Sequence, residues 1–160
     1  MREHRYTIEL PHSAARLWAV MQDYERWTDY APMVLRVDVL HPGDAAGNGL
    51  LRRVIYRMPL GRQGSALELV TDVEPARGYR FLMINRAPGN DQVGRVRLEP
   101  TGTNRTRLHF EERYNLTQRP WKWFEGPIYR FINKQNEVSM QRLSTWLTDH
   151  PEYRADLIEH

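Results

Sequence analysis

The strongest signal for the fold lies in the stretch of residues 106–147, TRLHFEERYNLTQRPWKWFEGPIYRFINKQNEVSMQRLSTWL. Its first part, 106–116, alternates apolar and polar residues, which predicts a β-strand. After Pro120 the spacing becomes helical, and Pro120 itself suits the start of a helix, whereas Gly126-Pro127 should kink or delay its first turn. One broad stripe is predicted to face a core: Phe124, Ile128, Phe131, Ile132, Gln135, Val138, Ser139, Leu143 and Trp146. The stretch therefore predicts a final strand followed by a long helix that ends near Leu147.

The region before this stretch predicts further strands. The expected segments are 5–10, 33–40, 49–58, 65–73, 79–85, 92–99 and 106–116. From residue 33 onward the breaks between them contain Pro and Gly, which favour turns, so consecutive strands should pair as an antiparallel meander.

The segment between the first two strands predicts two short helices. Ser13 is placed to cap the first of them, whose apolar residues follow at helical spacing, and Pro32 ends the second, around residues 27–30. Together the elements predict an α+β fold in which a seven-stranded curved antiparallel sheet surrounds the long C-terminal helix. We expect one domain over residues 1–147 and a polar tail over 148–160.

Composition restricts the function classes. The chain has 160 residues and no Cys, which excludes disulfides and thiolate chemistry. No apolar run has membrane-spanning length, and the N-terminus lacks an apolar signal region, so we expect a cytoplasmic protein. The formal charge is +3, but the arginines are scattered instead of clustered, so we expect no nucleic-acid partner.

The predicted architecture has a consequence for the interior. A helix is about 10–12 Å wide with its side chains, which is too narrow to fill so wide a sheet, so a cavity is expected. Alternation predicts these concave residues: Val54, Tyr56, Met58, Leu67, Leu69, Thr71, Tyr79, Phe81, Met83, Asn85, Val96, Leu98, Leu108, Phe110, Glu112 and Tyr114. Arg53, Arg57, Glu68, Asp72, Arg80, Arg95, Arg97, His109, Glu111 and Arg113 are predicted on the outer face. The alternative is an interior filled by the 5 Trp, 8 Tyr and 4 Phe.

Two segments resemble a known family. Residues 8–27, IELPHSAARLWAVMQDYERW, and 67–75, LELVTDVEP, are similar to the START-like, or Bet v 1-like (SRPBCC), helix-grip superfamily, in its bacterial polyketide cyclase/dehydrase and lipid-transport branch. The resemblance covers roughly residues 5–147. It implies a domain that encloses a small apolar molecule such as a lipid, a quinone or a polyketide-like aromatic. Some relatives cyclise or dehydrate their ligand and many only carry or sense it, so no catalytic residue is implied here.

Glu112 is the candidate catalytic residue. It alternates with Phe110 and Tyr114 and should point inward, where apolar surroundings would raise its pKa and suit it to acid–base chemistry. The alternative is a structural role, in which Glu112 pairs with an Arg or a Tyr hydroxyl. The expected ligand-binding residues are Tyr56, Met58, Leu69, Phe81, Met83, Asn85, Phe110, Tyr114, Gln135 and Ser139.

The sequence does not indicate a metal site or a cofactor site. The six histidines have no helical i, i+4 spacing and there is no glycine-rich phosphate loop after a strand, so we expect neither a metal nor a cofactor. Trp121, Trp123 and Phe124 stand beside Arg119 and Lys122, a cluster that predicts either peripheral membrane contact or packing over the open end of the cavity.

Three functions remain open at this point. The favoured one is binding or transport of a small hydrophobic ligand. The second is a cyclase/dehydrase-type enzyme that uses Glu112 and a tyrosine as acid–base groups. The third is a protein that engages a partner through its basic outer face. No feature of the sequence specifies an oligomeric state.

Overall fold

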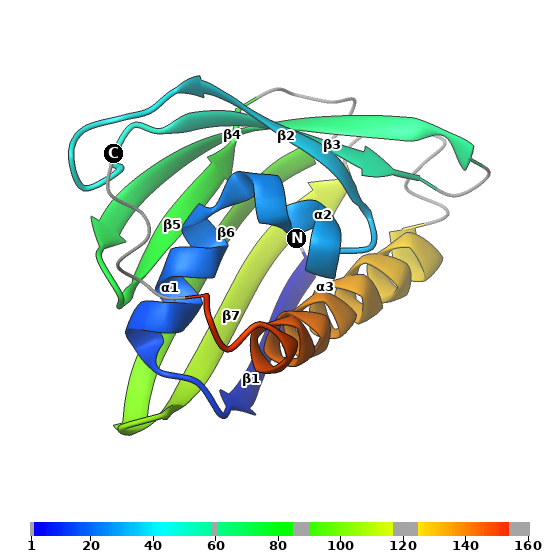
Figure 1. The fold of residues 1–160 in the computed structure, drawn as a ribbon. Helices are drawn as coiled ribbons and strands as arrows, with labels where there is room; N and C mark the ends of the chain where they lie inside the picture. The colour runs from blue at the N-terminus through cyan, green and yellow to red at the C-terminus, as the bar shows by residue number, and fades with distance from the viewer. Residues whose placement is uncertain (1, 59–60, 85–89, 117–124, 154–160) are drawn as a thin grey trace.

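The computed structural model describes residues 2–58, 61–84, 90–116 and 125–153 of the chain (Figure 1). In chain order its elements are β1 (Arg2–Leu10), α1 (Ala14–Gln22), a 3-10 turn (Tyr24–Arg26), α2 (Trp27–Tyr30), β2 (Val34–His41), β3 (Leu51–Arg57), β4 (Gln63–Glu74), β5 (Gly78–Met83), β6 (Asn90–Gly102), β7 (Arg105–Leu116) and α3 (Glu125–Asp149). The aromatic cluster at 121–124, the predicted helix start at Pro120 and Asn85 lie outside the described residues.

All seven strands form one antiparallel sheet in the order β1-β7-β6-β5-β4-β3-β2. Strands β2 to β7 therefore follow one another as a meander, and β1 returns beside β7. The sheet curls, and α1, α2 and α3 lie against its concave side (Figure 1). The predicted α+β helix-grip fold is confirmed. No helix in the described part of the chain is long and apolar enough to cross a bilayer.

Local sequence explains the ends of α1 and α3. Ser13 caps α1, because its hydroxyl oxygen accepts a hydrogen bond from the backbone N–H of Arg16 at 3.3 Å. The Arg16 guanidinium donates to the carbonyl oxygens of Leu147, His150 and Tyr153 at 2.5–2.9 Å, which satisfies acceptors at and beyond the end of α3. The helix thus runs two residues past its predicted end, and residues 150–153 of the predicted tail pack onto α1.

The core lies between the sheet and the helices. Leu17 and Val20 of α1, Leu143 and Leu147 of α3, and Leu108 of β7 are fully buried. Burying each such side chain contributes about 1.5–3 kcal/mol, so these contacts hold the helices on the concave face.

The predicted orientation of β4 is wrong by one residue. Leu67, Leu69 and Thr71 were expected to point inward, but Ala66, Glu68 and Val70 do. Leu69 lies on the outer face, where it pairs with Leu51 of β3 and Leu82 of β5, so it leaves the predicted ligand-binding set.

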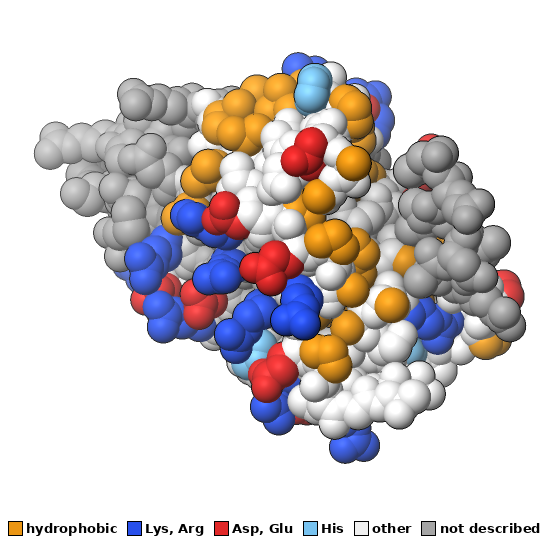
Figure 2. Space-filling model, turned by 90° about the vertical axis from the view of Figure 1, so that its left-hand side faces the viewer, with side chains coloured by type: hydrophobic (Ala, Val, Ile, Leu, Met, Phe, Trp, Pro, Cys, Tyr) orange, Lys and Arg blue, Asp and Glu red, His pale blue; other side chains and the backbone are white. Residues whose placement is uncertain are grey.

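The reason for the error is that the outer face carries its own apolar row. In that row Leu51, Leu69, Leu82 and Val93 stand side by side on four neighbouring strands. Hydrophobicity therefore does not distinguish the two faces of β4. Figure 2 shows hydrophobic side chains running across this side of the molecule, beside a region where basic and acidic side chains are interspersed.

Two strand glycines make room for aromatic rings on the concave face. A Cβ at Gly94 of β6 would overlap the ring of Phe81, which lies across the strand at this point. A Cβ at Gly64 of β4 would stand 2.6 Å from Tyr56 Cε2 and 3.2 Å from Met58 Cγ. Both rings therefore lie flat on the sheet instead of standing away from it.

Candidate ligand-binding site

Glu112 lies on the concave face of β7 beneath α3, with only 3% of its surface exposed. The side-chain amide of Gln92 on β6 donates to Glu112 Oε1, and Asn136 Nδ2 of α3 donates to Oε2 at 3.2 Å. Burial raises the pKa of Glu112 to about 7, and the charge of Glu68 adds to the rise, while the two amide hydrogen bonds oppose it. Glu112 therefore changes its protonation near neutral pH, and it can accept or donate a proton there.

An aromatic wall stands beside Glu112. His4 of β1 pairs with Glu112 across the strands, and its ring meets Tyr6 and Phe110 edge-on at 5.2 and 6.0 Å between centroids. Tyr6 and Phe110 stack at 5.1 Å. Burial lowers the pKa of His4, against the nearby charge of Glu137, so the wall is largely uncharged around Glu112.

A second polar centre lies on β3 and β4. Arg52 is only 2% exposed, and its Nε and Nη2 both donate to Glu68 Oε2 at 2.8 Å. The guanidinium stands 4.4 Å from the ring centroid of Trp27, and the rings of Tyr24 and Tyr79 lie 5.2 and 5.6 Å away. Burial alone would lower the pKa of Arg52, but the charge of Glu68 and the tyrosines outweigh it, so the pKa is raised and Arg52 stays charged.

Sequence reasoning missed this centre. It placed Glu68 on the solvated outer face and did not assign Arg52 to the interior. The signal that could have found the pair is their opposite charge at facing positions of β3 and β4. That signal depends on the strand register, which the hydrophobic pattern of β4 does not fix.

Tyr56 lies on β3, two residues before Met58. Burial raises the pKa of Tyr56, and the charges of Glu68 and Glu112 raise it further. Met58 lies beside it over Gly64. The structure thus brings Tyr56, Met58 and Glu112 to one concave surface, as predicted from alternation.

The remaining residues of the predicted ligand-binding set lie in different surroundings. Phe81 is buried against Phe110, with 6.5 Å between the ring centroids, and Met83 pairs with Glu68 across β4 and β5. The Ser139 hydroxyl of α3 donates to the carbonyl oxygen of Gln135 at 2.8 Å, so it is not available to donate to a ligand. The side chains of Asn85 and Tyr114 lie outside the described part.

The concave face is not completely closed by packing. Tyr6, Tyr56, Met83, Gln92 and Phe110 all point to the helix side of the sheet, yet each stays partly exposed. Accessible surface therefore remains around Glu112 and Tyr56. Among the described residues, no three His, Asp or Glu side chains gather as metal ligands.

Comparison with known proteins relates this chain to a family. The sequence profile of the family described as polyketide cyclase / dehydrase and lipid transport matches residues 1–147. The chain belongs to this family. Among curated proteins, no sequence matches it significantly.

Several solved structures share the fold. The Zhui aromatase/cyclase of Streptomyces sp. R1128 superposes with a TM-score of 0.79 at 15% identity, covering 93% of this chain and 94% of its own. TTHA0849 of Thermus thermophilus gives 0.75 at 20% identity, covering 90% of this chain and 95% of its own. A norcoclaurine synthase of Thalictrum gives 0.66 at 17% identity, covering 94% and 96%. At these identities the likeness shows the fold alone.

Proposed function

We propose that the domain binds a small, mostly apolar molecule between the concave face of the sheet and α3, and that Glu112 recognises a polar group of that molecule. The observation that carries the proposal is a buried carboxyl group beneath a helix, with two amide donors and an aromatic wall around it. Apolar sites with a few convergent polar groups are typical of small-molecule binding.

The surrounding residues restrict the ligand class. Tyr6, Tyr56, Met83 and Phe110 offer aromatic and thioether surface, which suits flat or extended hydrophobic molecules. Protonated Glu112 can donate to a carbonyl oxygen, and ionised Glu112 can accept from a hydroxyl group. A lipid, a quinone or a polyketide-like aromatic combines these features, and lipids and polyketides also appear in the description of the family.

The second candidate is an enzyme of the cyclase/dehydrase type. It is favoured by the pKa of Glu112 at about 7, because a general base or acid works best when its pKa lies near the working pH. Ionised Glu112 would remove a proton from a carbon beside a carbonyl group and return it to a departing hydroxyl group. Tyr56 would donate a hydrogen bond to the developing oxyanion.

Two measurements test these proposals. Native mass spectrometry of the purified protein is expected to find a co-purifying apolar molecule. With that molecule in hand, Glu112→Gln is compared with Glu111→Gln, whose parent residue is the exposed neighbour on the outer face of β7. Binding alone predicts lower affinity for Glu112→Gln and no turnover by either protein. The enzyme reading predicts turnover that Glu112→Gln abolishes with affinity nearly intact. A protein that takes up no apolar molecule of these classes would refute both.

A further inference from the structure

A cavity of about 570 Å³, separate from the surface around Glu112, opens at one end of the sheet. It is lined by the turn between β4 and β5, the far half of β6 and the first residue of α1: Ala14, Asp72, Glu74, Pro75, Ala76, Arg77, Gly78, Arg95, Arg97, Leu98, Glu99 and Pro100. The backbone N–H of Leu98 donates to the carbonyl oxygen of Arg77 at 2.7 Å, which fixes the turn on β6. The volume suits a small molecule more than a single ion.

Three arginines of this cavity are exposed and form no ion pair. Arg77, Arg95 and Arg97 have no carboxylate within ion-pair distance among the described residues, although the charge of Arg97 acts on Glu99 and helps to lower the pKa of that carboxyl group. Arg95 and Arg97 lie two residues apart on β6 and therefore on the same face of the strand. Three guanidinium groups at one cavity provide paired donors of the geometry that phosphate and carboxylate groups bind.

The acidic residues of the cavity are largely engaged elsewhere. Asp72 forms an ion pair with Arg80 at 3.0 Å. Glu99 is held by His109 at 2.9 Å and by Arg107 at 3.8 Å. Of the three carboxylates that line the cavity, Glu74 is the one without an ion pair within the described chain. Among the charged residues that line the cavity, three arginines and one carboxylate therefore have no ion pair within the described chain.

The start of α1 adds to this positive character. Ala14, the first residue of α1, lines the cavity, and the first turn of the helix contains no acidic residue. Ser13 already accepts from the N–H of Arg16, so what the helix end offers is mainly the partial positive charge of its dipole, which favours an anion nearby.

Two residues at the rim of the cavity have an unusual backbone conformation. Asp72 and Ala76 have φ of 52° and 57°, and they are the two non-glycine residues with positive φ in the described chain. Such conformations cost energy in residues with a side chain and gather at functional sites. Here they shape the turn that carries Arg77.

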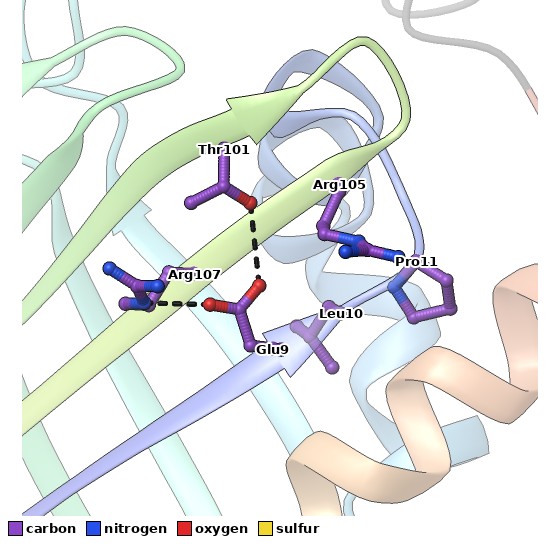
Figure 3. Close-up of a pocket in the computed structure, with 6 residues that line it drawn as sticks. All are labelled: Glu9, Leu10, Pro11, Thr101, Arg105 and Arg107. Atoms are coloured by element: carbon purple, nitrogen blue, oxygen red, sulfur yellow. Dashed lines mark hydrogen bonds and ion pairs between the residues drawn. The ribbon is translucent and has the colours of Figure 1, made fainter.

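A neighbouring cavity provides a contrast. It has a volume of about 370 Å³ and is lined by Glu9, Leu10, Pro11, Thr101, Arg105 and Arg107. Figure 3 shows that Thr101 and Arg107 both bind the carboxylate of Glu9, at 3.3 and 2.7 Å. Its polar groups therefore largely satisfy one another, whereas those of the larger cavity do not.

We propose that the larger cavity binds a small multivalent anion through Arg77, Arg95, Arg97 and the start of α1. The ligand carries phosphate or carboxylate groups and is distinct from the apolar molecule of the concave face. Arg95 and Arg97 contact it directly, because they line the cavity and neither is held in an ion pair within the described chain.

Isothermal titration of the full chain at low ionic strength tests this, with pyrophosphate and citrate as probes. We expect at least one probe to bind with a dissociation constant below about 10 mM. The double variant Arg95→Gln/Arg97→Gln should lose at least about tenfold in affinity, since charge-assisted hydrogen bonds are the strong ones. The preferred probe then identifies the chemistry as phosphate or carboxylate.

Arg53→Gln is the matched control, because Arg53 is an exposed arginine on the outer face of β3, away from the cavity. It should bind the probe within about twofold of the wild type. Unchanged melting temperatures confirm that the variants fold. No binding of either probe, or an equal loss in Arg53→Gln and the double variant, would overturn the proposal, since the second result shows only general charge attraction.

Discussion

Replacing Glu112 by Gln should make the stability of the domain less dependent on pH. Glu112 has an ordinary pKa of 4.5 in the unfolded chain, and burial raises it to about 7 in the folded protein. Between these values the folded state binds more protons than the unfolded state. The free energy of unfolding therefore falls as pH rises through this window, because the buried carboxyl group must ionise. Gln has nearly the same shape and no proton to lose.

The expected size follows from the two pKa values. The difference between 4.5 and about 7 corresponds to about 3 kcal/mol of stability, at about 1.4 kcal/mol for each pH unit. Most of this, about 2.5 kcal/mol, is lost between pH 5 and 8.5. The amides of Gln92 and Asn136 can turn to pair with the amide of Gln, so the variant keeps its hydrogen bonds.

Urea denaturation at pH 5 and pH 8.5 measures the effect. From pH 5 to pH 8.5 the free energy of unfolding should fall by about 2.5 kcal/mol more in the wild type than in Glu112→Gln. Glu111→Gln, a change in the exposed neighbour, should keep nearly the pH dependence of the wild type. An equal pH dependence in the wild type and Glu112→Gln would refute the raised pKa and with it the buried placement of the carboxyl group.

Two further changes test the concave face. Glu68→Leu should lower the free energy of unfolding by about 3–5 kcal/mol, because it leaves the charge of Arg52 buried without a partner. The double variant Arg52→Met/Glu68→Leu should lower it much less. Equal losses in urea denaturation would mean that the two residues are not coupled. Gly94→Ala should lower the free energy of unfolding by about 1–3 kcal/mol, because the new Cβ meets the ring of Phe81. Adding Phe81→Leu to the same chain should recover part of this loss. An unchanged melting temperature for Gly94→Ala would contradict the close packing of this ring on β6.

The elements of the fold could be predicted because their signals are local. Proline and glycine mark the turns of the meander, Ser13 has a side chain that caps a helix, and the helical stripe of α3 extends over many residues. The inward orientation of Glu112 was predicted for the same reason, since Phe110 two residues before it on β7 also points inward.

The partners within the site could not be predicted, because they depend on distances between elements. The sequence stripe drew attention to Gln135, but Asn136, the next residue on α3, is the one that reaches Glu112. Glu68 was assigned to the solvent because the alternation of β4 was interpreted with Leu67 and Leu69 pointing inward. Its partner Arg52 is set by the register of β3 on β4. Such pairs become visible only once the register is known.

A crystal structure of the protein with the apolar molecule that native mass spectrometry identifies tests most directly whether the concave face is the binding site. The molecule is expected between α3 and the concave face of the sheet, against Tyr56 and Phe110, with one polar atom within hydrogen-bonding distance of the Glu112 carboxyl group. A molecule bound elsewhere, or a concave face filled by its own aromatic side chains with Glu112 touching no ligand, would contradict this expectation.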